Sequence, residues 1–164
     1  MDTFRNHRRD RVVLGGRATG GFTIIELLLV LTLIGVLVGI ALPTYRAHKE
    51  RVKVADAIAD LGGISARVKL YWEDARAYPD SLAELGLDTM RDPWGNPYRY
   101  LNLQTANSNA FARKNRALVP INTDFDLYSM GPDGRSVSPL TAAASQDDIV
   151  RANDGRYLGR AADY

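Results

Sequence analysis

The chain has 164 residues, 46% hydrophobic and 24% charged, which is enough for one folded domain and excludes wholesale disorder. It contains no cysteine, which excludes disulfides, thiol nucleophiles and cysteine-ligated metals, and two histidines leave little material for histidine-dependent catalysis. The net charge of +2 arises in residues 1–21, which carry five arginines against two aspartates, so we expect no nucleic-acid partner for the rest of the chain.

Residues 22–42 form a continuous apolar segment whose only charged residue is Glu26. As a helix that rises about 1.5 Å per residue, the segment spans roughly 30 Å, which is the thickness of the hydrocarbon core of a bilayer. Arginines precede the segment and a domain of mixed charge follows it. This asymmetry predicts a single-pass protein with its N-terminus in the cytoplasm and its C-terminal domain on the other side of the membrane.

Three interpretations of this segment compete. It could be a secretory signal peptide cleaved after Ala41, or an uncleaved anchor. Glu26 argues against both, because a carboxylate in hydrocarbon costs about 3 kcal/mol and no basic residue lies within helical reach of it in residues 22–42. In the third interpretation the chain is cut between Gly21 and Phe22, and the new amino group of one subunit pairs with Glu26 of a neighbour.

Residues 20–27, with the sequence GGFTIIEL, resemble the type III signal of type IV pilins and type II secretion pseudopilins. The resemblance implies that a prepilin peptidase cuts after Gly21 and methylates the new N-terminal Phe22. It also implies that Glu26 is the carboxylate used in assembly. Pro43 lies at the position of the mature helix where this family usually has a proline.

The helical period continues beyond the apolar segment, through residues 43–76. We expect one helix of roughly 50 residues, about 75 Å long, bent at Pro43 and loosened at Gly62-Gly63. Its apolar stripe should face a sheet. The stripe consists of Val54, Ile58, Leu61, Val68 and Trp72, with Ala55, Ala59, Ile64 and Tyr71 beside it.

Residues 92–101 predict a tight turn that leads into a strand, and they resemble the Asp-Pro-Trp-Gly element of the major pseudopilins. Residues 125–128 predict a second strand, which closes at the turn of residues 129–134. Between the two strands, residues 102–122 predict a solvated loop with a strand-like stretch at 117–121. The loop carries a small basic cluster: Arg113, Lys114 and Arg116.

Asp133, Asp147 and Asp148 are the candidate metal ligands. On composition alone we favour a helix capping box from Ser145 to Asp148. The turn at residues 129–134 and the later Asp-Asp-Ile resemble the C-terminal loop of the major pseudopilins, which implies that these aspartates and backbone carbonyls hold calcium. Calcium takes six to eight oxygens in flexible geometry, which two loops can supply. Two further aspartates are weaker candidates: Asp124 and Asp126.

The resemblance covers residues 20–101 and 124–150. Two segments depart from the family pattern. The loop between Leu101 and Asp124 is long, and the segment 135–146 is longer than we expect. The tail, residues 151–164, also has no counterpart in the pattern.

The resemblance implies an α+β fold of the type IV pilin class, with a long N-terminal helix packed on a small antiparallel sheet. The expected organisation is a cleaved leader (1–21), a transmembrane and filament-core helix (22–42), its amphipathic continuation (43–76) and a periplasmic head with a calcium loop (77–164). The chain would be a structural subunit of the pseudopilus of a type II secretion system, and not an enzyme.

The implied partners are copies of the chain, minor pseudopilins, the prepilin peptidase, the inner-membrane assembly platform and membrane lipid. Two alternatives stay open. A type IV pilin, major or minor, shares the leader and the helix. A membrane-anchored periplasmic calcium-binding domain belongs to another class of protein and would keep its N-terminus intact.

Overall fold

The computed structural model describes residues 20–105 and 110–164. The chain divides into two units, residues 1–43 and 44–164. In the described part the one α-helix is α1, Ile24–Ala75, which has 52 residues and contains Pro43. The long helix predicted from the apolar segment and the amphipathic stripe is therefore present.

The first part of α1 contains no buried residue. Every residue from 22 to 49 is exposed. The large hydrophobic side chains of residues 22–42 range from 43% exposed at Val30 to 85% exposed at Phe22. This part of the helix is long and apolar enough to cross a membrane.

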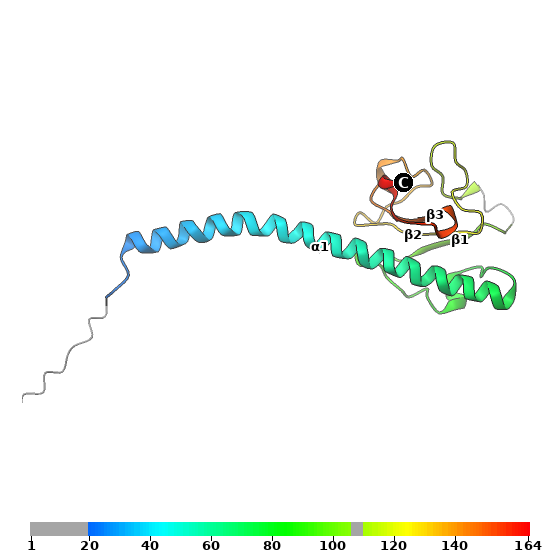
Figure 1. Cartoon of the computed structure of the whole chain (residues 1–164), viewed down its shortest axis with the longest axis horizontal. Helices are drawn as coiled ribbons and strands as arrows, with labels where there is room; N and C mark the ends of the chain where they lie inside the picture. Colours follow the sequence, from blue (N-terminus) through cyan, green and yellow to red (C-terminus); the bar gives the residue numbers. More distant parts are fainter. Residues whose placement is uncertain (1–19, 106–109) are drawn as a thin grey trace, which may run out of the picture. The chain divides into compact units, whose positions relative to one another are not determined.

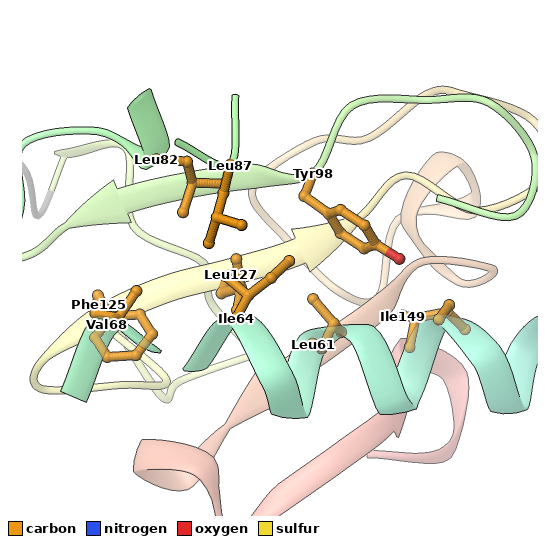
Figure 2. Close-up of a cluster of buried hydrophobic side chains, with 10 residues drawn as sticks. Leu61, Ile64, Val68, Leu82, Leu87, Tyr98, Phe125, Leu127 and Ile149 are labelled. Carbon is orange, nitrogen blue, oxygen red and sulfur yellow. The ribbon is translucent and has the colours of Figure 1, made fainter. Parts of the chain in front are cut away.

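The second part of α1 packs on a sheet through a stripe with helical spacing (Figure 2). The predicted Leu61, Ile64 and Val68 are buried. Ala55 and Ala59 are exposed, so their assignment to the stripe was wrong. The buried positions of the helix are spaced three and four residues apart, which keeps them on one face: Ala57, Leu61, Ile64, Ser65 and Val68.

The sheet has four strands in the order β1-β2-β3-β4, and all neighbours are antiparallel. Figure 1 shows β1, β2 and β3 beside the C-terminal part of α1. The strands are β1 (Arg99–Asn102), β2 (Phe125–Ser129), β3 (Ile149–Ala152) and β4 (Tyr157–Arg160). Short 3₁₀ turns complete the described elements: η1 (Leu82–Leu85), η3 (Ala143–Ser145), η4 (Asn153–Gly155) and η5 (Ala161–Asp163).

Two of these elements differ from the expectations. The tail beyond residue 150 supplies the end of β3 and the whole of β4, which closes the sheet on one side. The predicted strand-like stretch at residues 117–121 forms no strand, and only an isolated bridge joins Leu118 to Asn115. The stretch contributes one buried side chain to the apolar core, Ile121, which is 3% exposed.

The sheet separates two apolar clusters. On one face, Ile149 and Phe125 join the cluster under α1 that Figure 2 shows. On the other face, Val150 packs with Ile121 and Leu140, which come from the loops on either side of β2. A long N-terminal helix packed on a small antiparallel sheet is the type IV pilin-like α+β fold that the resemblance implies.

Candidate functional site

Glu26 lies in the first turn of α1 and forms a reciprocal capping box with Thr23. Glu26 Oε2 accepts a hydrogen bond from the backbone N–H of Thr23 at 3.1 Å, and the N–H of Glu26 donates to Thr23 Oγ1 at 3.2 Å. The carboxylate also lies where the helix dipole favours negative charge. Sequence reasoning looked for a basic partner and missed this local one, although the Thr-x-x-Glu spacing signals it.

The predicted processing site precedes this box. Gly20, Gly21 and Phe22 are exposed and lie outside the helix, which begins at Ile24. Nothing outside the adjacent chain lies within 4 Å of the Cβ positions of Gly20 and Gly21. The peptide bond after Gly21 is thus on an open, non-helical stretch of chain, while cleavage and methylation there stay predictions.

Pro43, the other predicted assembly residue, lies inside α1 at the boundary of the two units. Its ring lacks a backbone N–H, so this position weakens the hydrogen-bond ladder of the helix. Its role in assembly stays a prediction.

The two turns that carry the head's resemblance to pseudopilins are joined to each other. Asp92 Oδ1 accepts the backbone N–H of Trp94 at 3.0 Å and of Asn96 at 2.8 Å, which closes the first turn. Asp92 Oδ2 accepts the hydroxyl of Ser129 at 2.5 Å. The amide of Asn96 donates to the carbonyl oxygen of Gly131 at 2.8 Å. The first turn therefore supports the second, where the candidate metal ligands begin.

Gly131 brings the second turn against the candidate ligand Asp147. Its φ is +62°, and a Cβ built there would lie 2.5 Å from the backbone oxygen of Asp147. Only glycine fits this close approach without a shift of the backbone. The N–H of Asp133 donates to Asp147 Oδ2 at 3.3 Å, and Asp133 Oδ1 accepts the N–H of Arg135 at 2.8 Å. Asp133 and Asp147 are thus neighbours in the loop.

Asp148, the third candidate ligand, is fully buried and faces an arginine. Asp148 Oδ2 lies 2.5 Å from Arg113 Nη2 and accepts the hydroxyl of Ser136 at 2.5 Å. Burial raises the pKa of Asp148 to about 6, while the hydrogen bond from Ser136 and the charge of Arg113 act in the opposite direction. A charged carboxylate at this depth therefore depends on its cationic partner.

The described residues include no cluster of three metal-ligating side chains around Asp133, Asp147 and Asp148. Within residues 20–105 and 110–164, no group of three or more carboxylate, histidine or cysteine side chains is arranged to hold a metal ion. Asp148 has one buried oxygen without a hydrogen-bond partner, Oδ1. This oxygen alone could supply one ligand, whereas calcium takes six to eight. Calcium binding stays a prediction of the resemblance alone.

The residue-based alternative for this loop, a capping box from Ser145 to Asp148, was wrong. Ser145 does not begin a helix with Asp148 in its first turn, because it ends the 3₁₀ turn η3. Its hydroxyl accepts the N–H of Val137 at 2.9 Å and donates to the carbonyl oxygen of the same residue at 2.8 Å. Ser145 therefore ties the two ends of the long segment 135–146 together.

The two weaker metal candidates are engaged with other groups. Asp126, 1% exposed, accepts the N–H of Arg113 at 2.6 Å and the amide of Asn122 at 2.8 Å, which anchors the loop before β2. Asp124 accepts both terminal nitrogens of Arg151, at 2.8 Å and 2.5 Å. Both aspartates act here as buried acceptors of the chain's own donors.

Arg151 is a residue that sequence reasoning missed. It lies on β3, its side chain is fully buried, and its Nε donates to Ser65 of α1 at 3.1 Å. Its guanidinium lies 3.9 Å from the ring centroid of Phe125 and donates to that residue's carbonyl oxygen at 2.9 Å. Arg151 therefore joins β3 to β2 and to the second part of α1.

Comparison with known proteins gives relatives over most of the chain. The type II secretion system core protein G of Pseudomonas aeruginosa is 29% identical over a match that covers 73% of this chain and 87% of that protein. The protein of the same name from Aeromonas hydrophila is 26% identical over 84% of this chain and 94% of its own length. The fimbrial protein EcpC of Eikenella corrodens is 37% identical, over 41% of this chain and 44% of its own length. No family model and no solved structure matches.

The helix on a small antiparallel sheet, together with these relatives, defines a pilin-like subunit with a membrane anchor. The chain resembles type IV pilins and type II secretion pseudopilins over most of its length, and its resemblance to the G-type major pseudopilins is confirmed. The names of the relatives are those of secretion-system and fimbrial components, which supports a structural subunit and not an enzyme.

Proposed function

We propose that this chain is a structural subunit of the pseudopilus of a type II secretion system. It is made with a basic leader, residues 1–21, and held in the inner membrane by residues 22–42 with its head in the periplasm. A prepilin peptidase cleaves it after Gly21 and methylates Phe22. The subunit then leaves the membrane at the assembly platform and polymerises with its own copies and with minor pseudopilins.

The observation that carries this proposal is the exposed apolar surface of residues 22–42. Lipid covers such a surface in the membrane, and the same segment of neighbouring subunits would cover it in a filament. An ordinary anchor would need lipid only. The second feature is Glu26, the fifth residue after the cleavage site, whose charge a positive group of a neighbouring subunit would balance in the filament.

Glu26 supplies the register of the filament in this proposal. After cleavage, each subunit carries a free amino group at Phe22 and a carboxylate four residues later at Glu26, so the carboxylate of one subunit can meet the amine of the next. A buried ion pair of this kind contributes specificity more reliably than stability. Thr23 holds the carboxylate at the helix start until assembly.

The intact mass of the mature protein, purified from membranes, tests this proposal. We expect a chain that begins at Phe22 and carries one additional methyl group. A mass that retains Met1, or a chain that begins after Ala41, would contradict the proposal and favour the anchored-domain or signal-peptide interpretation. Inactivation of the prepilin peptidase provides the control, because it should leave residues 1–21 attached.

A type IV pilin is the second candidate, because fimbrial proteins are among the relatives, although they match less of this chain. Deletion of the gene separates the two functions. Loss of protein secretion supports the pseudopilin, while loss of surface fibres with normal secretion supports the pilin.

A further inference from the structure

The two segments in which the chain departs from the pseudopilin pattern contact each other. The N–H of Lys114, in the first segment, donates to the carbonyl oxygen of Ser138 in the second at 3.1 Å. The N–H of Leu140 donates to the carbonyl oxygen of Lys114 at 2.9 Å, and the hydroxyl of Ser138 donates to the carbonyl oxygen of Ala112. The long loop before β2 and the long loop after it are therefore one structural feature.

Arg113 is the centre of that feature, and its description as part of a solvated basic cluster was wrong. Its side chain is 4% exposed. Its Nη1 donates to the hydroxyl of Ser136 at 2.5 Å and to the carbonyl oxygen of Val137 at 2.7 Å, and its Nη2 lies 2.5 Å from Asp148 Oδ2. The guanidinium thus donates hydrogen bonds to three kinds of oxygen in the loop: a hydroxyl, a carbonyl and a carboxylate.

These oxygen types are the ones that calcium prefers. An arginine can replace such an ion as a structural cation because its charge is permanent and its donors form a fixed, planar fork. The guanidinium also lies 4.3 Å from the ring centroid of Tyr128 on β2, which adds a cation–π contact that favours the buried charge. A calcium ion bound to Asp148 would bring a second cation against the same carboxylate, where the two would repel.

We propose that Arg113 is the structural cation of the C-terminal loop. It fastens residues 136–137 to Asp148 in the place where the family resemblance predicts a metal, so the folded head does not depend on calcium. The long loop before β2 has, in consequence, a function: it delivers this arginine to the loop after β2. This inference concerns the stability of the head and is independent of filament assembly, so either can fail without the other.

Thermal unfolding of the full-length chain in detergent micelles tests the proposal. The two tryptophans of the chain, Trp72 and Trp94, both lie in residues 44–164, so their fluorescence reports on unfolding of the head. We expect the same Tm in EGTA and in millimolar calcium. A Tm that falls in EGTA and recovers with calcium overturns the proposal.

Substitution of the cation provides the second arm. Arg113→Met should lower the Tm by on the order of 10 °C, because it leaves Asp148 buried without a counter-charge. The matched control is Arg135→Met, an exposed arginine of the same loop, which should leave the Tm within about 2 °C of the wild type. Equal effects of the two substitutions overturn the proposal.

Asp148→Asn covers the case in which Arg113→Met does not fold. It keeps the shape of the side chain and removes the charge that Arg113 meets. We expect a lower Tm that is the same in EGTA and in calcium. The proposal is overturned if the variant and the wild type have the same Tm in EGTA, while calcium raises the Tm of the wild type alone. That result would show that Asp148 binds a metal.

Discussion

Residues 22–42 and the head differ in how their apolar and charged side chains are covered. The large side chains of the apolar segment are exposed, and its one carboxylate accepts hydrogen bonds from the neighbouring Thr23. The head buries two arginines and pairs each with an aspartate of its own chain. In the proposed function other molecules cover the first region, whereas the second balances its buried arginines within the chain. A filament subunit needs both properties, because polymerisation requires an exposed apolar segment together with a domain that folds on its own.

The largest effect should come from the charge of Glu26. Glu26→Gln keeps a group that can accept the N–H of Thr23, so the helix cap survives, but the negative charge is lost. We expect filament yield to fall roughly tenfold or more, since a pair with a buried amine loses one partner. Electron microscopy and sheared-fraction immunoblots measure this yield.

The control for this change is Thr23→Ala, which removes the capping hydroxyl and leaves the carboxylate. Filaments should persist in this variant, because a lost cap costs only about 1 kcal/mol. Equal loss in the two variants would mean that assembly does not depend specifically on the charge of Glu26, which would contradict the account.

The next effect, on the head, concerns Arg151. Arg151→Met leaves Asp124 without its bidentate partner and removes the link to Ser65 of α1. Loss of one partner of a buried pair costs about 3–5 kcal/mol, so we expect the Tm to fall by on the order of 10 °C. Tryptophan fluorescence during heating measures it. The exposed Arg156→Met should behave like the wild type, and a similar fall there would contradict the assignment.

Gly131 gives a somewhat smaller effect. Gly131→Ala combines a positive φ of +62° with a Cβ 2.5 Å from the backbone oxygen of Asp147. We expect a loss of about 2–4 kcal/mol, because an L-residue there is strained and the neighbouring backbone must shift. Chemical unfolding curves measure this loss. Gly134→Ala, whose Cβ would meet only the side chain of Asn96 at 3.1 Å, should cost less. The reverse order would contradict the close approach.

The smallest effect concerns the contact of the first turn with α1. Trp94 Nε1 donates to Glu50 Oε1 at 2.5 Å, and Lys53 lies 5.8 Å from the centroid of the same ring. Trp94→Phe keeps a ring and removes the donor, so we expect a loss of about 1 kcal/mol. Circular dichroism during heating should show a fall of a few degrees in Tm. An unchanged Tm would show that this contact contributes nothing to stability.

The elements with local patterns could be predicted from the sequence. The apolar run and the stripe at Leu61, Ile64 and Val68 specify α1, and the alternation around Tyr98 and Phe125 specifies β1 and β2. β3 and β4 could not be predicted in the same way. β3 carries Arg151 among apolar residues and is buried on both faces, so it lacks the alternation of a half-exposed strand.

The loop of aspartates shows a second limit. Arg113 and Asp148 are 35 residues apart in the chain, and nothing local indicates that they meet. A basic run in a polar loop is ordinarily solvated, which is the interpretation that the sequence favoured. Lys114 and Arg116 fit it better than Arg113 does, since they are half-buried and exposed respectively. The resemblance to the family predicted a cation in this loop. That the cation is Arg113 follows from the three-dimensional structure alone.

The structure of the assembled filament by cryo-electron microscopy tests the central claim most directly. We predict that residues 22–42 form the filament core, packed against the same segment of neighbouring subunits, while the heads lie outside. The carboxylate of Glu26 should lie ~3 Å from the methylated amine of a neighbouring Phe22. A filament in which residues 22–42 lie on the outside, or in which Glu26 faces no amine, would contradict the account.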